Sequence, residues 1–177
     1  GILQPIEYLK NVDLARIGFG QTIAMTPLQL ITAVSAAING GNLYQPYVVD
    51  KFVDSEGNVI KEFEPVLKRQ VISEETSETM RTILEKVVSE GGGKNGQIEG
   101  YRVGGKTGTA QKYEDGKIAQ GKHISSFISF APVEDPQLVV LILVDEADVA
   151  VDFGSTVAAP YVKNVMESSL KYLKIPP

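Results

Sequence analysis

Three strand-like stretches separated by short turns limit most strongly what this chain can fold into. They cover residues 103–112, 123–132 and 137–145. Asp115-Gly116 and Glu134-Asp135-Pro136 supply the turn signals between them. Connections this short join antiparallel neighbours, whereas parallel strands need a crossover of a dozen or more residues. The sequence therefore predicts an antiparallel meander, and its last strand, apolar at every position from 138 to 144, should be covered on both faces.

A helix is expected over residues 26–39, because both of its ends are marked. Thr26, Pro27 and Gln29 fit a capping box with proline in the first turn, and Gly40-Gly41 ends the pattern. Apolar residues cover most of the circumference, which is typical of a buried helix. Some other part of a protein should therefore cover it.

Two further helices and a ribbon complete the expected fold. Ser73 can cap a helix that Gly91-Gly92-Gly93 ends, and Pro160 suits the first turn of a C-terminal helix. The earlier helix has an apolar face of Met80, Ile83, Leu84, Val87 and Val88, and the later one a stripe of Val162, Val165, Met166, Ser169 and Leu173. Residues 43–63 should form a β-ribbon with a turn at 54–58. This order predicts an α+β fold, with helices covering an antiparallel sheet.

The composition excludes several classes of function. The 177 residues fit one domain, and a net charge of −5 without a long basic run argues against a nucleic-acid partner. The absence of cysteine excludes thiolate chemistry, and a single histidine makes a His-rich metal site improbable. That histidine, His123, is expected to be an ordinary polar surface residue. No apolar run reaches membrane-spanning length, and a start at Gly1 suggests a fragment of a longer protein.

The segment Lys106-Thr107-Gly108-Thr109 is the strongest candidate site. On a strand, Thr107 and Thr109 point to the same face, because side chains alternate with period two. Gly108 has no Cβ, so a ligand backbone can approach closely. Lys106 adds a fixed positive charge. Together they predict an edge strand that binds a carboxylate and an acyl group.

The same residues also fit a phosphate-binding loop. Residues 100–107 match the pattern G-x-x-x-x-G-K-[ST], and residues 138–146 form an apolar strand that ends in Asp145-Glu146, as in P-loop NTPases. A P-loop needs an apolar strand before its first glycine and a helix at Lys-Thr. Here residues 91–99 are Gly-rich and polar, and a turn signal follows at 113–116. The P-loop is therefore the weaker interpretation.

The Lys-Thr-Gly triplet and its flanks resemble the transpeptidase domain of class B penicillin-binding proteins, especially a sporulation-specific member. The similar segments are Ile17-Gly-Phe-Gly-Gln21, Met25-Thr-Pro-Leu-Gln-Leu30, Ala37-Ile-Asn-Gly-Gly41, residues 100–112, Phe127-Ile-Ser-Phe-Ala-Pro132 and Gly154-Ser-Thr-Val-Ala-Ala-Pro160. They span essentially the whole chain. The resemblance implies the penicillin-binding-protein and serine β-lactamase-like fold, peptidoglycan cross-linking without a cofactor, and an anchored parent protein at the extracytoplasmic membrane face.

The resemblance also implies a role for each residue of the candidate site. Lys106 would tune a proton relay and attract the terminal carboxylate of a stem peptide ending in D-Ala-D-Ala. Thr107 and Thr109 would hydrogen-bond that carboxylate, and the backbone N–H of Thr109 would be an oxyanion-hole donor. The peptide would lie along the strand edge beside Gly108. β-Lactams would bind at the same place.

Two elements of that family are missing. The chain has no Ser-x-Asn, and its one Ser-x-x-Lys, Ser168 to Lys171, lies in the last helix, after the Lys-Thr-Gly strand. We interpret that match as chance. Residues 1–177 are therefore expected to be the C-terminal half of a transpeptidase domain, inactive alone because they lack the nucleophile. The N-terminal half would then be a partner. A non-catalytic binding or scaffolding module of the same fold is the alternative.

Overall fold

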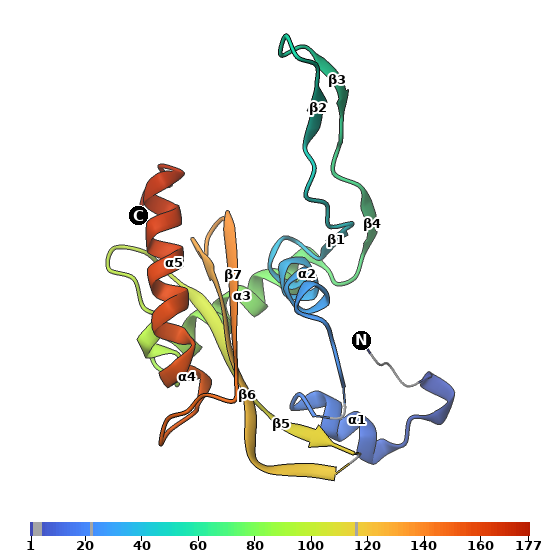
Figure 1. Ribbon diagram of the computed structural model, residues 1–177, viewed down its shortest axis with the longest axis vertical. Coiled ribbons are helices and arrows are strands. Elements are labelled where there is room, and N and C mark those ends of the chain that lie inside the picture. The colour runs from blue at the N-terminus through green and yellow to red at the C-terminus, as the bar shows by residue number, and fades with distance from the viewer. Residues whose placement is uncertain (2–4, 22, 116) are drawn as a thin grey trace.

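The computed structural model describes residues 1, 5–21, 23–115 and 117–177 and has an α+β fold (Figure 1). Its elements are η1 (Ile6–Tyr8), α1 (Asn11–Gly18), α2 (Pro27–Ile38), β1 (Asn42–Tyr44), β2 (Lys51–Val53), β3 (Val59–Glu62), β4 (Leu67–Gln70), α3 (Glu74–Ser89), η2 (Lys94–Gly96), β5 (Gly104–Glu114), β6 (Lys117–Ala131), β7 (Leu138–Asp145), α4 (Gly154–Val157) and α5 (Ala159–Tyr172). Within the described ranges, none of the helices is long and apolar enough to span a membrane.

The predicted antiparallel meander is confirmed. β5, β6 and β7 form one sheet in that order, and both pairs are antiparallel. β6 starts at Lys117, earlier than the predicted residue 123. The expected turn residue Gly116 lies outside the described residues. The register places Lys106 opposite Ile128, so these two side chains share one face of the sheet.

Two hydrophobic clusters lie on opposite faces of this sheet. The larger one joins α5 to Phe127, Ala131 and alternate residues of β7, and Val88 of α3 belongs to it. The smaller one joins Ile38 of α2 to Phe130 and Val133. Both faces of β7 therefore contact a core, as predicted. The coverage is incomplete, because the side chain of Leu143 is 40% exposed.

The start of α2 is as predicted, but its burial is not. Thr26 Oγ1 accepts the N–H of Gln29 at 3.2 Å, and the Gln29 side chain accepts the N–H of Thr26 at 3.0 Å. Only Ala36 and Ile38 are buried in the helix, and Leu28 is 58% exposed. The expectation of a helix buried all round is therefore wrong for its first turns. Within the described chain, full burial is confined to the C-terminal end of α2, and residues 30–32 are half-buried.

Helix α3 begins at its predicted cap, where Ser73 Oγ accepts the N–H of Thr76 at 3.1 Å. Val88 is buried, but Ile83 is half-exposed, so the predicted apolar face is wrong at that position. In helix α5 the buried residues are Ala159, Val162, Met166 and Leu170.

The predicted stripe of α5 is wrong at Val165 and Leu173, both of which are about half-exposed. Helical spacing allows two neighbouring stripes through Val162 and Met166. Contact with the sheet selects the one that contains Ala159 and Leu170.

The predicted ribbon is present and longer than expected. β2 pairs with β3, and β1 pairs with β4, so one hairpin is nested inside the other. The inner hairpin projects from the body of the molecule (Figure 1). The Asp54 side chain closes its turn by accepting the N–H groups of Glu56 and Asn58, each at 2.9 Å.

Candidate active site

The candidate site is built on an edge strand. Within the described chain β5 pairs with β6 alone, so its other edge carries backbone N–H and C=O groups without a strand partner. Such an edge can accept an extended peptide as an additional strand. The sequence-based prediction of an edge strand at the Lys-Thr-Gly triplet is therefore confirmed.

The four predicted residues lie in succession on β5. Lys106 and Thr109 are exposed, and Thr107 and Gly108 are half-buried. The ammonium group of Lys106 donates to the carbonyl oxygen of Thr107 at 2.9 Å. Within the described part of the chain this ammonium group forms no ion pair, whereas Lys112 on the same strand forms two. The positive charge of Lys106 is therefore available to a ligand.

The register shows which side chains share a face. Thr107 lies opposite Phe127 and Thr109 opposite Ser125, on the face that α5 covers. Lys106 and Gly108 belong to the opposite face. The predicted alternation is therefore confirmed, and the two threonines lie on the other side of the strand from the lysine.

The carbonyl group of Gly108 points toward β6. A Cβ atom added to Gly154 would lie 2.8 Å from the oxygen of Gly108 and closer still to that of Ser126. Because this one position is close to both oxygens, the two oxygens must lie near each other, between β5 and β6. In a planar trans peptide the N–H points opposite to the C=O. The N–H of Thr109, which shares this peptide with Gly108, therefore points to the free edge of β5.

Close packing also limits the space for side chains at the glycine positions of β5. A Cβ on Gly108 would lie 2.6 Å from Ser126 Oγ, and one on Gly105 would lie 2.8 Å from the backbone oxygen of Ile128. On Gly104 it would meet the ring of Phe130. A side chain at position 108 would therefore have to displace the Ser126 hydroxyl, whereas one at position 105 would meet the backbone of β6.

The P-loop alternative is wrong. Lys106 and Thr107 lie inside a strand, and no helix begins at them. The segment before Gly100 contains the short helix η2 and, over residues 91–99, no strand. Asp145 and Glu146, the proposed magnesium-binding acids, instead contact Lys112 at 2.9 and 2.6 Å.

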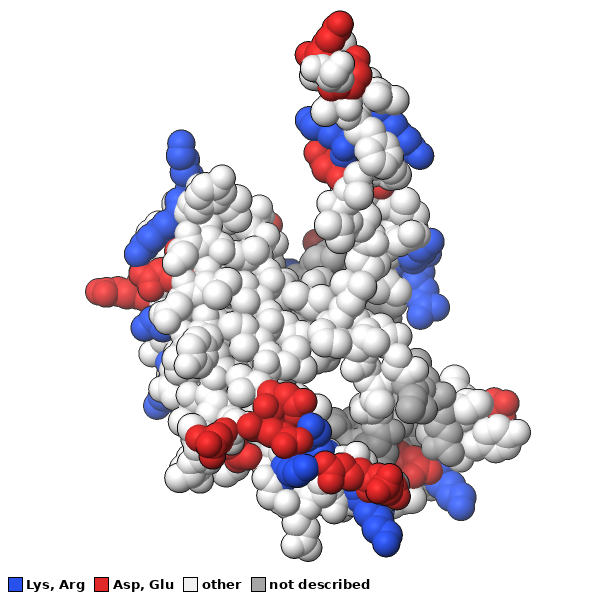
Figure 2. All heavy atoms as spheres, viewed as in Figure 1, with Lys and Arg blue, Asp and Glu red and all other residues white. Residues whose placement is uncertain are grey.

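Charged groups brace both ends of β5. Hydrogen bonds that the Lys112 ammonium group donates to Glu146 and Asp145 raise the pKa of Lys112 above its ordinary value. At the other end, Arg102 donates to Glu85 at 2.6 Å and also pairs with Glu134. The hydrogen bond from Arg102 lowers the pKa of Glu85. In Figure 2 acidic and basic side chains lie together at the lower end, where Figure 1 places the β5–β6 hairpin.

One contact beside the site, between His123 and Asp152, was not predicted from the sequence. His123 Nδ1 lies 2.6 Å from the carboxylate of Asp152, and both side chains are about three-quarters buried. The interpretation of His123 as an ordinary surface residue is therefore wrong. Asp152 lies far away in sequence, in the segment before α4. No local motif signals such a pair.

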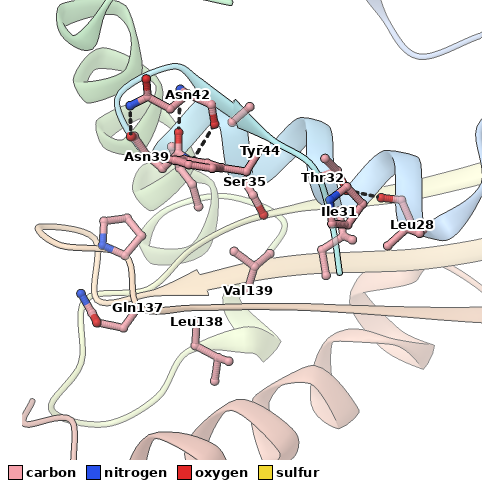
Figure 3. A pocket seen from close by; sticks show the side chains of 14 residues that line it. Leu28, Ile31, Thr32, Ser35, Asn39, Asn42, Tyr44, Gln137, Leu138 and Val139 are labelled. Carbon is pink, nitrogen blue, oxygen red and sulfur yellow. Dashed lines mark hydrogen bonds between the residues drawn. The ribbon is translucent and has the colours of Figure 1, made fainter. Parts of the chain in front are cut away.

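A cavity of about 440 Å³ lies elsewhere, between α2, β1 and the β6–β7 turn. Figure 3 shows its mainly apolar lining, which includes Ile31, Leu138 and Val139. Asn39 and Asn42, which are joined by hydrogen bonds, line one side of the cavity. No residue from 104 to 111 lines this cavity, so it is separate from the candidate site.

Comparison with known proteins agrees with this geometry. The family model "Penicillin binding protein transpeptidase domain" matches residues 1–167. The chain is 52% identical to stage V sporulation protein D of Bacillus subtilis, with all of this chain and 28% of that protein covered. It is 36% identical to a peptidoglycan D,D-transpeptidase FtsI homolog of Mesostigma viride, with 94% of this chain and 30% of that protein covered.

Solved structures show the same fold. The apo transpeptidase domain of Burkholderia pseudomallei penicillin-binding protein 3 superimposes with a TM-score of 0.84 at 32% identity, over all of this chain and 51% of that one. Penicillin-binding protein 3 of Mycobacterium tuberculosis in complex with aztreonam gives a TM-score of 0.87 at 26% identity, over 99% of this chain and 41% of that one. The chain thus spans under a third of the two curated relatives. It belongs to the penicillin-binding protein transpeptidase family.

Proposed function

We propose that residues 1–177 are the C-terminal half of a serine-type D,D-transpeptidase domain that cross-links peptidoglycan stem peptides. The chain would supply the strand that holds the substrate carboxylate and one oxyanion donor. The observation that carries this proposal is the geometry of β5. Among the described residues its edge has no strand partner, the N–H of Thr109 points toward that edge, and Lys106 forms no ion pair beside it. The name of the Mesostigma relative, a peptidoglycan D,D-transpeptidase homolog, supports the reaction class.

Each residue of the candidate site on β5 then has a specific role. Lys106, on the other face of β5 from the two threonines, tunes the proton relay of the attacking serine and attracts the carboxylate of D-Ala-D-Ala through its charge. Thr107 and Thr109 hydrogen-bond that carboxylate, and the stem peptide lies along the strand beside Gly108. The N–H of Thr109 stabilises the tetrahedral oxyanion. A preorganised donor of this kind contributes about 3–4 kcal/mol to transition-state stabilisation.

The attacking serine would come from the N-terminal half of the same domain. The Ser168-x-x-Lys171 match lies in α5, where Ser168 is exposed and follows the candidate strand in sequence. Nucleophilic catalysis needs the serine and its base together, so the chain alone would be inactive. β-Lactams would bind at the β5 edge; complexes of the Mycobacterium tuberculosis relative with ampicillin and with aztreonam support this ligand class. The substrate would place the protein at the extracytoplasmic face of the membrane, through an anchor in the longer protein.

Acylation by a fluorescent penicillin tests this function in the longer protein that carries both halves. Lys106→Ala should lower the acylation rate strongly. The matched control is Lys112→Ala, a lysine of the same strand whose charge is already neutralised by Asp145 and Glu146. Thr109→Ala should lower the rate less, because its backbone N–H survives. Acylation of Lys106→Ala at the wild-type rate would contradict the proposal.

One observation favours a second candidate, a non-catalytic module of the same fold. The chain has no Ser-x-Asn and no Ser-x-x-Lys ahead of β5. A longer protein that stays unlabelled by penicillin while binding stem peptide would support this candidate. The isolated chain should stay unlabelled in either case, and a stoichiometric acyl adduct on one of its serines would contradict both.

A further inference from the structure

We propose that Asp152 is a positioning residue for the oxyanion donor of the site. Through His123 and Ser125 it fixes the turn that rests against the peptide group between Gly108 and Thr109. The inference rests on the proposed function, because it assigns the effect to the Thr109 N–H.

Asp152 is held to β6 at two points. The N–H at Nδ1 of His123 donates to its carboxylate, 2.6 Å away. The hydroxyl of Ser125 donates to its backbone carbonyl. Ser125 is buried, and both partners belong to the strand that pairs with the candidate site. Side chain and backbone of Asp152 are therefore fastened independently to the same strand.

The residues that follow Asp152 connect it to β5. Gly154, the first residue of α4, approaches the carbonyl oxygens of Gly108 and Ser126 so closely that no side chain fits between. The next residue is held by η2, because Asn95 Nδ2 donates to the carbonyl of Ser155 at 2.7 Å. The turn is therefore held close to the backbone of β5.

The orientation of the Gly108 carbonyl group sets the orientation of the oxyanion donor, because the C=O of Gly108 and the N–H of Thr109 belong to one peptide. A planar peptide rotates as a unit, so any tilt of the C=O tilts the N–H of Thr109 by the same angle. Stabilisation by such donors depends on their preorganised direction toward the developing charge. Loosening Asp152 should therefore impair transition-state binding more than ground-state binding.

The experiment measures penicillin acylation of the longer protein, with saturation kinetics that separate the acylation rate constant from the binding constant. Asp152→Ala should lower the acylation rate constant about tenfold or more, with a smaller change in the binding constant, as expected for an interaction made mainly in the transition state. Asp152→Asn should restore the rate to within about threefold of wild type, because its amide oxygen still accepts from His123.

Arg102→Ala is the matched control. It breaks two ion pairs at the opposite end of β5, in which the Arg102 side chain itself is more exposed than His123 or Asp152, so it reports the effect of a merely structural loss. It should change the acylation rate constant by less than about threefold, because exposed ion pairs contribute little to stability. His123→Ala removes only the side-chain attachment of Asp152. It should lower the acylation rate constant in the same way, so it tests the inference even if Asp152→Ala does not fold.

The outcomes distinguish a failure of this inference from a failure of the proposed function. If the wild-type protein is not acylated, the proposed function fails and the inference fails with it. If the wild-type protein is acylated, and folded Asp152→Ala and His123→Ala keep its acylation rate constant, the inference alone is overturned. An equal loss in Arg102→Ala would also overturn it.

Discussion

Gly105→Ala should distort the candidate strand through one added methyl group. That carbon would lie 2.8 Å from the backbone oxygen of Ile128, 2.9 Å from Cζ of Phe127 and 3.3 Å from Cγ2 of Val88. The oxygen belongs to the paired strand, and the ring of Phe127 is fully buried. Neither can move without disturbing the sheet, so the strand itself must shift next to Lys106.

The cost follows from overpacking of a closed core, which typically destabilises by about 1–3 kcal/mol. For a protein of this size that corresponds to a fall in Tm of about 2–12 °C. Gly92→Ala is the matched control, because its new Cβ would meet nothing within 4 Å. It should change stability by less than about 0.5 kcal/mol.

Thermal melts followed by circular dichroism compare these variants directly. Phe127→Leu in the Gly105→Ala background should recover only part of the loss, because the backbone oxygen of Ile128 still blocks the added carbon. Equal melting temperatures for Gly105→Ala and Gly92→Ala would refute the reasoning. So would a full rescue by Phe127→Leu, since it would mean that the strand pairing is not the constraint.

Three further outcomes are expected. In urea titrations, Met166→Ala should cost about 2–5 kcal/mol because Met166 is fully buried, whereas Val165→Ala should cost less than about 0.5 kcal/mol; similar costs would contradict the observed stripe. Arg102→Ala should lower stability at neutral pH only slightly, because the Arg102 side chain is exposed. Since the pKa of Glu85 is lowered in the folded state, the part of this difference that Glu85 contributes should be lost as the pH falls through that pKa; a wild-type-to-variant difference unchanged at pH 3 would contradict this. The isolated chain should self-associate or bind the N-terminal half of the domain, because Leu28 and neighbouring apolar surface are exposed; sedimentation as a monodisperse monomer with a cooperative melt would argue against this.

Features set by local chemistry could be predicted from the sequence. The caps at Thr26 and Ser73 depend on residues three positions away, and both were found where expected. The meander followed from turn length, and the position of Lys106 on an edge strand followed from its motif. Each of these inferences uses interactions that span only a few residues.

Features set by distant contacts could not be predicted. Val165 and Val162 have the same hydrophobic character, and only the position of α5 on the sheet decides that Val162 is buried. His123 and Asp152 are brought together by the path of the chain after β7, which no local pattern describes. The exposure of Leu28 likewise depends on what else packs on α2.

The order of strands in the sheet bears on how the protein folds. β5, β6 and β7 are neighbours in sequence as well as in space, so each pairing closes only a short loop and loses little chain entropy. The nested hairpins of the ribbon can likewise zip from the turn that Asp54 closes toward the β1–β4 ladder. Local pairings of this kind form rapidly. We therefore expect the Lys-Thr-Gly strand to take its shape early in folding, before contacts between segments distant in sequence form.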